Sequence, residues 1–162
     1  MKIYLIGMPL SGKSLIGELL ANELGFGFVD IDSYIEHKHS CRIYDLVKTD
    51  EAHFRHLETD ALIDFIDKED LVISTGGGIV LNRDNKKLMR GIIIYLDTPL
   101  EVLESRLNKS YTRPLLEQNS LKTLLEQRIG QYRYFQTYTI KTTSPLESVE
   151  GIINKLKKEN LL

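Results

Sequence analysis

The sequence has little of what secreted and membrane proteins need. Its 162 residues include a single cysteine, Cys41, so no disulfide can form within the chain. No apolar run approaches the roughly 20 residues of a membrane-spanning helix. The first residues carry one lysine and an apolar run that is too short for a secretory signal. These absences predict a soluble protein of the reducing cytoplasm.

Neither sign of charge is in excess, and aromatic residues are few. The formal net charge is −2, which provides no overall attraction to nucleic acid or to a membrane surface. Tryptophan is absent, and the eight tyrosines have no regular spacing suited to stacking on bases. We expect no nucleic-acid partner and no membrane partner. The four histidines lack further histidine or cysteine ligands at metal-binding spacing, so no structural metal site is predicted.

Proline is also scarce, and linkers and repeats are missing. The four prolines are spread along the chain, and no low-complexity segment divides it. A chain of this length suits one compact domain. We therefore predict a single domain over residues 1–162, and we expect it to be a monomer.

Short apolar runs alternate with segments of helical period. The expected strands are 2–6, 26–31, 71–74, 92–96 and 137–141, and the expected helices are 13–24, 51–67, 99–107, 121–134 and 145–158. This alternation predicts an α/β fold with a parallel sheet and helices on both faces. Ligands of such folds bind beyond the carboxyl ends of the strands. Three polar or glycine-rich features follow expected strands: residues 7–14, Asp30 with Asp32, and residues 76–78.

The segment GMPLSGKS, residues 7–14, lies between the first expected strand and the first expected helix. It matches G-x-x-x-x-G-K-[ST] in the context where that pattern binds nucleotide phosphates. Glycines allow backbone N–H groups to face phosphate oxygens, and the following helix adds its positive dipole end. Lys13 supplies a charge for the β- and γ-phosphates, and Ser14 a hydroxyl for Mg²⁺. We predict a nucleotide-binding loop rather than a turn that only caps a helix.

Small GTPases carry the same loop, but two of their other signals are missing. No aspartate is followed by glycine three residues later. The segment Asn108-Lys109-Ser110-Tyr111 lacks the aspartate that guanine recognition needs. The sequence therefore favours another class of protein with this nucleotide-binding loop, or P-loop.

Asp30 and Asp32 end the second expected strand. In a kinase, one such carboxylate helps to hold Mg²⁺ and the other accepts the proton of the substrate hydroxyl. The alternative is that Asp32 only caps the following helix. The phosphate loop upstream favours the kinase interpretation.

The remaining polar features are ambiguous when taken singly. Arg55 and Glu58 in HFRHLE share a helix face, as a solvated ion pair also would. The three glycines of STGGG suggest close approach of the backbone to a ligand. Arg113 lies in a segment between two helices, where a closing loop would exclude water from the γ-phosphate. Arg128 and Tyr132 lie four residues apart on a later helix.

Taken together and in order, these motifs resemble those of the shikimate kinase family: GMPLSGKS, DID, FRHLE, STGGG, RPLL and R-x-x-x-Y. The resemblance covers nearly the whole chain. It implies a three-layer P-loop fold of the nucleoside-monophosphate-kinase type, with five parallel strands in the order 2-3-1-4-5. It also implies a mobile lid at about residues 108–117 and a substrate-binding helical region at about residues 32–61. The implied reaction is ATP-dependent phosphorylation of the shikimate 3-hydroxyl, with Mg²⁺, on the route to chorismate and aromatic amino acids.

The resemblance implies roles by matched position. Asp32, Lys13 and Arg113 would be catalytic, with Asp32 holding the substrate hydroxyls and acting as base. Ser14 and Asp30 would serve Mg²⁺, Asp30 through water. The implied nucleotide-binding residues are Gly7, Pro9, Leu10, Ser11, Gly12, Lys13, Ser14, Leu15, Arg113 and Arg106, the last of these against adenine. The implied substrate-binding residues are Asp32, Arg55, Glu58, Gly76, Gly77, Gly78 and Arg128.

The chemistry of the substrate agrees with these roles. Shikimate is a small monoanion with vicinal hydroxyls, so two arginines for its carboxylate and an aspartate for its diol match it. Gripping the carboxylate far from the reacting oxygen would orient that oxygen toward the γ-phosphate. Glu58 is then expected to hold Arg55 in place.

Two alternatives stay open on the sequence. A kinase of another hydroxy acid, such as gluconate, shares the P-loop, although FRHLE and STGGG favour shikimate. A non-catalytic nucleotide-binding module is suggested only by Leu10, where the family usually has glycine. A Cβ at this position restricts the backbone conformations open to the loop. The sequence contains all the residues expected for phosphoryl transfer, Asp32, Arg55, Arg113 and Arg128. A module that only binds nucleotide would not need them.

Overall fold

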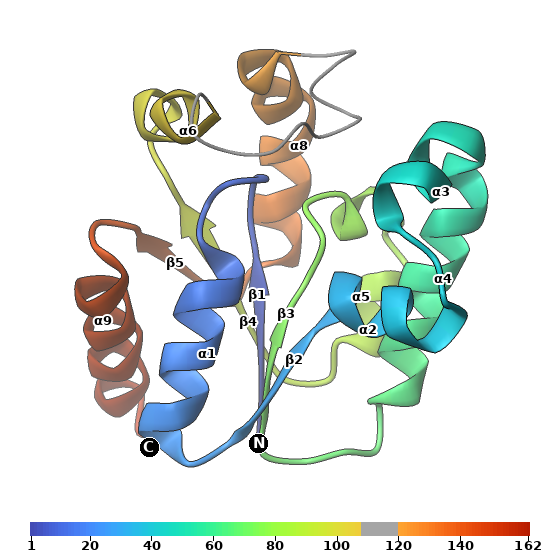
Figure 1. The fold of residues 1–162 in the computed structure, drawn as a ribbon. Coiled ribbons are helices and arrows are strands. Elements are labelled where there is room, and N and C mark those ends of the chain that lie inside the picture. Colours follow the sequence, from blue (N-terminus) through green and yellow to red (C-terminus); the bar gives the residue numbers. More distant parts are fainter. Residues whose placement is uncertain (108–119) are drawn as a thin grey trace.

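The computed structural model describes residues 1–107 and 120–162, and its centre is a five-stranded sheet. The strands are β1 (Lys2–Ile6), β2 (Gly27–Asp30), β3 (Leu71–Ser74), β4 (Ile92–Asp97) and β5 (Tyr138–Lys141). They run parallel in the order β2-β3-β1-β4-β5, as predicted (Figure 1). All carboxyl ends therefore meet at one edge of the sheet.

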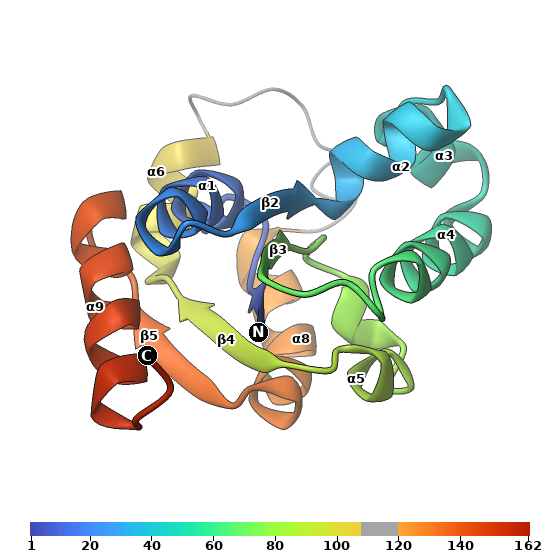
Figure 2. The same ribbon diagram turned by 90° about the horizontal axis from the view of Figure 1, so that it is seen from below.

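Helices cover both faces of this sheet (Figure 2). On one face, α1 (Lys13–Leu24) packs beside α9 (Pro145–Lys158). The other face carries α4 (Glu51–Asp64) and α8 (Leu121–Phe135). Helix α6 (Leu100–Leu107) contacts α8 and adds Leu103 to the core under that face. Strand β1 shows why two cores form. Ile3 and Leu5 join the cluster under α1 and α9, whereas Tyr4 and Ile6 join the other, because side chains alternate along a strand.

Three helices at the β2 end of the sheet account for most of the region from 32 to 61. These are α2 (Ile31–His39), α3 (Ile43–Thr49) and α4, and they pack on one another (Figure 1). Asp50 ends α3 and caps α4, since its Oδ1 accepts a hydrogen bond from the backbone N–H of His53 at 3.0 Å. The role of this region in substrate binding stays a prediction.

Several boundaries differ from the sequence prediction. The helix expected to reach residue 67 ends at Asp64, where the buried Lys2 ammonium donates hydrogen bonds to the carbonyls of Phe65 and Ile66. The second strand ends at Asp30 because that residue caps α2. Three short elements were not predicted from the sequence: α3, the 3₁₀ turn η1 (Ile79–Leu81) and α5 (Asn85–Leu88), which are too short to show a helical period.

Two sequence predictions fall outside this description. The expected lid at residues 108–117, together with Arg113, lies outside the described residues. Within residues 1–107 and 120–162, no helix is both long enough and apolar enough to cross a bilayer.

Candidate active site

A cavity of about 780 Å³ opens at the carboxyl ends of the strands. Its lining joins segments that are far apart in the sequence. The predicted residues among them are Pro9, Leu10, Ser11, Gly12, Lys13, Ser14, Leu15, Asp30, Asp32, Gly76, Gly77 and Arg106. The lining residues that were not predicted from the sequence are Ile16, Glu18, Phe28, Ser33, Thr75, Thr143 and Pro145. The last two follow β5, so the rule that ligands bind beyond carboxyl ends was a usable signal for them.

The phosphate loop curls around its own lysine. Lys13 Nζ donates hydrogen bonds to the carbonyl oxygens of Gly7 at 3.0 Å and Met8 at 2.8 Å. Gly12 ends the loop with a φ of 87° and stands at the N-cap of α1 without a side-chain cap. The first backbone N–H groups of α1 therefore begin beside a buried ammonium. An anion is the ligand that both features favour.

Leu10 takes the conformation that a glycine would take. Its φ is 69°, in the left-handed region that costs a residue with a side chain about 1–2 kcal/mol. The Cβ of Leu10 was expected to restrict the backbone, but it does not prevent this left-handed conformation. Two contacts offset the cost. The Leu10 side chain packs against the core, and its carbonyl accepts a hydrogen bond from Arg106 Nη1 at 2.7 Å.

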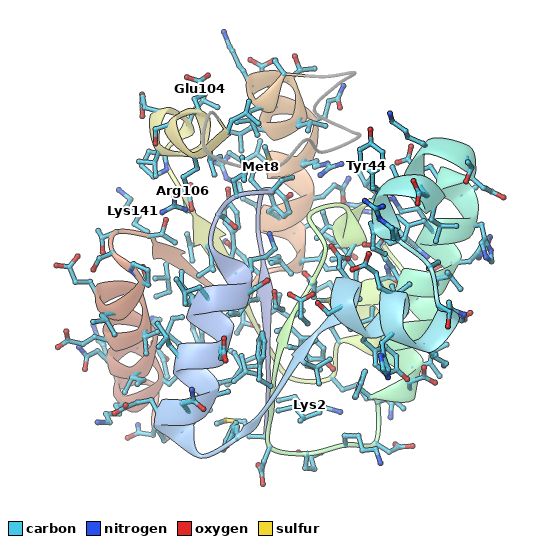
Figure 3. All side chains as sticks on the ribbon, in the orientation of Figure 1. Lys2, Met8, Tyr44, Glu104, Arg106 and Lys141 are labelled. Carbon is cyan, nitrogen blue, oxygen red and sulfur yellow. The ribbon has the colours of Figure 1, made fainter. Side chains whose placement is uncertain are left out.

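Arg106 thus connects α6 to the loop. Figure 3 shows its side chain beside the turn that carries Met8. Arg106 also lines the cavity. It therefore both stabilises the phosphate loop and lies at the predicted nucleotide site.

Ser14 and Asp30 meet at the base of the cavity. The Ser14 hydroxyl donates a hydrogen bond to Asp30 Oδ2, and Asp30 Oδ1 accepts one from the backbone N–H of Ser33 at 3.0 Å. Asp30, and not Asp32, is therefore the N-cap of α2, so the capping role considered for Asp32 is wrong. The helix starts at Ile31, two residues before Ser33, where a helix capped by Asp32 would start.

This pair fits a magnesium ion. A hydroxyl and a carboxylate are hard oxygen ligands, and Mg²⁺ in kinases takes only one or two of its ligands from the protein. The described residues contain no group of three or more metal-ligating histidine, cysteine or acidic side chains. Such an ion would therefore have to complete its shell with phosphate oxygens and water.

The triple glycine packs against side chains of the predicted substrate-binding residues. A Cβ on Gly76 would lie 2.5 Å from Glu58 Oε1 and 3.1 Å from Asp32 Oδ1. A Cβ on Gly78 would lie 2.4 Å from Arg55 Nη1. Real Cβ atoms essentially never lie within 3.0 Å of another heavy atom, as these would to Glu58 and Arg55. The glycines are therefore needed for close packing, because their backbone has no side chain to exclude the acidic and basic groups.

Arg55, Glu58 and Arg128 form a buried charged cluster. Arg55 Nη1 donates a hydrogen bond to Glu58 Oε2 at 2.7 Å, as expected for a glutamate that holds the arginine, and its Nη2 reaches Glu51 Oε1 at 3.2 Å. Glu58 is 1% exposed and Arg128 is 3% exposed. Within the described residues, three buried polar atoms of this cluster have no hydrogen-bond partner: Arg55 Nε, Glu58 Oε1 and Arg128 Nη1. Unsatisfied buried guanidinium groups favour an anionic ligand.

Burial raises the pKa of Glu58 to about 7, although the adjacent Arg55 guanidinium opposes that shift. Asp32 raises the same pKa further and Arg128 lowers it, so the charges of all three neighbours act on Glu58. The structure therefore brings together the predicted substrate residues from α2, α4 and α8 beside the triple glycine.

The raised pKa of Glu58 predicts a pH dependence of stability. The ordinary pKa is 4.5, so between about pH 4.5 and pH 7 the folded protein binds a proton at Glu58 that the unfolded chain releases. The contribution of this group to the free energy of unfolding is therefore present below pH 4.5 and is lost as the pH rises through 7. Glu58→Gln is expected to remove this contribution.

Denaturant unfolding at about pH 5 and about pH 8 would measure the effect. The control is Glu126→Gln, because Glu126 is exposed on α8. We expect the difference in unfolding free energy between the two pH values to change in Glu58→Gln and to stay as in the unmodified protein in Glu126→Gln. An unchanged difference in Glu58→Gln would contradict the raised pKa.

Comparisons with known proteins agree with this geometry. The family model described as shikimate kinase matches residues 9–157. The shikimate kinase of Sulfurihydrogenibium sp. (strain YO3AOP1) is 38% identical over 162 residues, which cover 96% of this chain and 98% of the relative. The structure of shikimate kinase from Acinetobacter baumannii in complex with shikimate has a TM-score of 0.91 and 33% identity, over 99% of this chain and 95% of that chain.

A more distant neighbour bears on the gluconate alternative. A gluconokinase from Sinorhizobium meliloti 1021 has a TM-score of 0.65 and 20% identity, over 99% of this chain and 94% of that chain. That likeness shows a shared fold alone. The family model, by contrast, spans most of the sequence, and the relative above has more than 30% identity over nearly the whole chain. On these grounds the chain belongs to the shikimate kinase family.

Proposed function

We propose that this chain transfers the γ-phosphoryl group of ATP to the 3-hydroxyl of shikimate, giving shikimate 3-phosphate and ADP. One observation carries the proposal. Buried guanidinium groups with unsatisfied nitrogens lie together with Asp32 around the triple glycine, next to the phosphate loop. A small carboxylate with vicinal hydroxyls is complementary to that set. The product belongs to the route to chorismate and aromatic amino acids.

Arg55 and Arg128 bind the shikimate carboxylate in this proposal. Their buried nitrogens are desolvated, so an anion that pairs with them gains more than it would at the surface. Glu58 orients Arg55 through the 2.7 Å hydrogen bond. The glycines at 76–78 line the substrate site, because they allow the backbone to approach. Holding the carboxylate at this end directs the ring hydroxyls toward Asp32 and the phosphate loop.

The nucleotide occupies the cavity in this proposal. Gly7 to Leu15 cradle its phosphates, Lys13 moves from the loop carbonyls to the β- and γ-phosphates, and Arg106 lies against the adenine. Ser14 and Asp30 hold Mg²⁺, which when bound neutralises charge on the phosphate oxygens. Arg113, proposed from the sequence alone, supplies a further positive charge from the lid.

Transfer then needs one proton acceptor. Asp32 hydrogen-bonds the 3-hydroxyl and takes its proton, while the hydroxyl oxygen forms a bond to the γ-phosphorus. The bond between that phosphorus and the bridging oxygen of ADP breaks, and ADP leaves with the electron pair. Most of the acceleration is expected from positioning and from positive charge around the phosphoryl group.

A coupled assay of ADP formation tests the proposal. We expect ADP release that requires both Mg²⁺ and shikimate, with gluconate giving no more than the background ATPase rate. Shikimate 3-phosphate should form in equal amount to ADP. Turnover with gluconate and not with shikimate would overturn the assignment, and ATP binding with no turnover on either would favour the non-catalytic module. We also infer a cytoplasmic monomer, for which size-exclusion chromatography with light scattering tests the oligomeric state.

Gly78→Ala is predicted to weaken shikimate binding without unfolding the protein. The φ of Gly78 is −101°, which alanine adopts freely, but the new Cβ would collide with the Arg55 guanidinium. That group is the end of a flexible side chain and will move away. We expect shikimate affinity to fall about tenfold, the scale of one charge-assisted hydrogen bond, with ATP affinity unchanged.

Isothermal titration calorimetry with shikimate measures this loss. Gly130→Ala is the matched control, because a Cβ on Gly130 of α8 meets no atom within 4 Å. It should stabilise the helix by about 0.5–1 kcal/mol and leave shikimate binding as it is. Equal shikimate affinities in the two variants would remove Gly78 and Arg55 from the substrate site.

A further inference from the structure

Tyr132 contacts Gly77, the middle residue of the triple glycine. It lies on α8, one helical turn after Arg128, and is fully buried. Its hydroxyl donates a hydrogen bond of 2.6 Å to the carbonyl oxygen of Gly77. Its ring stacks on Tyr95 of β4, with centroids 5.1 Å apart and an angle of 14° between the planes. The ring is therefore held by the sheet, and the hydroxyl has a defined target.

The three glycine carbonyls are held in different ways. The carbonyl of Gly76 accepts from the backbone N–H of Ile79 at 3.2 Å, and that of Gly78 accepts from Leu81 at 3.0 Å. Both are local bonds of the 3₁₀ turn. The carbonyl of Gly77 instead takes its hydrogen bond from Tyr132, 55 residues later in the chain. The peptide between Gly77 and Gly78 is thus oriented by a tertiary contact.

The orientation of that peptide has a consequence for the site. A trans peptide is planar, so its carbonyl and its N–H point in opposite directions. Holding the Gly77 carbonyl toward Tyr132 therefore sets the direction of the Gly78 N–H. Gly77 also packs against the phosphate loop, where an added Cβ would lie 2.9 Å from Pro9 Cδ. The Gly77–Gly78 peptide lies between the phosphate loop and α8, and the hydroxyl of Tyr132 sets its orientation.

We propose that Tyr132 is a positioning residue for the substrate: its hydroxyl orients the Gly77–Gly78 peptide in the direction that shikimate binding requires. This inference rests on the proposed function. The hydroxyl stays protonated and able to donate at neutral pH, because burial raises its pKa, while the positive charge of the adjacent Arg128 and a side-chain hydrogen bond with it oppose that rise. Tyr132 acts through the backbone and takes no part in phosphoryl transfer.

Tyr132→Phe is the test, because it removes the hydroxyl and keeps the ring stacked on Tyr95. We expect the dissociation constant and KM for shikimate to rise about five- to tenfold, the scale of one hydrogen bond. The kcat at saturating shikimate and the KM for ATP should stay within about twofold. Calorimetric titration with shikimate, and separately with ADP, gives the affinities without relying on turnover.

The chain offers a matched control in Tyr4→Phe. Tyr4 is also fully buried, but within the described residues its hydroxyl has no hydrogen-bond partner. Removing that hydroxyl should leave both ligand affinities unchanged. The inference is overturned if Tyr132→Phe binds shikimate as tightly as the unmodified protein, or if it loses shikimate and ADP affinity equally, as a general loosening would produce. Failure of the unmodified protein to bind shikimate would instead overturn the proposed function.

Discussion

Asp32→Asn is expected to lower kcat by about 10²–10⁴-fold, the range that a positioned general base contributes. The amide has the shape of the carboxylate but cannot accept the hydroxyl proton. Asp32 faces Gly76 beside Glu58, so the substitution also removes one negative charge from a crowded acidic pair. The fold should therefore be retained, and ATP affinity should stay within a few-fold.

Steady-state kinetics with shikimate, together with calorimetric titration with ADP, measures both quantities. The matched control is Asp60→Asn, which makes the same chemical change at an exposed position of α4. It should behave as the unmodified protein. Normal turnover in Asp32→Asn would remove Asp32 from the role of base. A parallel loss of nucleotide affinity would point to a role at the phosphate loop instead.

The second large effect is expected from Arg128→Ala, which should weaken shikimate binding by about 100-fold or more. Truncating one partner of a buried charged pair costs about 2–5 kcal/mol, because the remaining charge is left desolvated. Arg128 is 3% exposed, and one of its nitrogens is buried with no partner among the described residues. The ligand carboxylate would lose that partner, while the KM for ATP should change little.

Two further variants make the result specific. Arg128→Lys keeps the charge but loses the planar fork of donors, so its shikimate affinity should fall between those of the unmodified protein and Arg128→Ala. Arg133→Ala removes an arginine from the exposed side of the same helix and should leave shikimate affinity as it was. Unchanged shikimate affinity in Arg128→Ala would place the carboxylate elsewhere.

The parts of this fold that the sequence predicted are those with a local signal. The strands 2–6 and 71–74 and the helices 13–24 and 145–158 were predicted to the residue. Apolar runs mark the strands, Gly25 follows α1, and α9 begins with Pro145 directly after its cap, Ser144. The phosphate loop has its own pattern in consecutive residues. Short elements without a buried stripe, such as α3, gave no such signal.

The roles of neighbouring aspartates needed the structure. Asp30 and Asp32 are equally placed in the sequence to cap a helix, and only the start of α2 at Ile31 shows that Asp30 does so. Leu10 is a similar case. Its sequence position suggested a restricted backbone, but packing and the bond from Arg106 hold it in a left-handed conformation.

By itself, the sequence determined the class of fold, the phosphate loop and the residue types of the site, because these depend on hydrophobic period and on short patterns. Only the tertiary structure decided which groups share a site. Arg55 and Glu58 come from α4, Arg128 and Tyr132 from α8, and the glycines from the turn after β3. Their meeting depends on how α4 and α8 pack over one face of the sheet, and those contacts join residues that no local pattern relates.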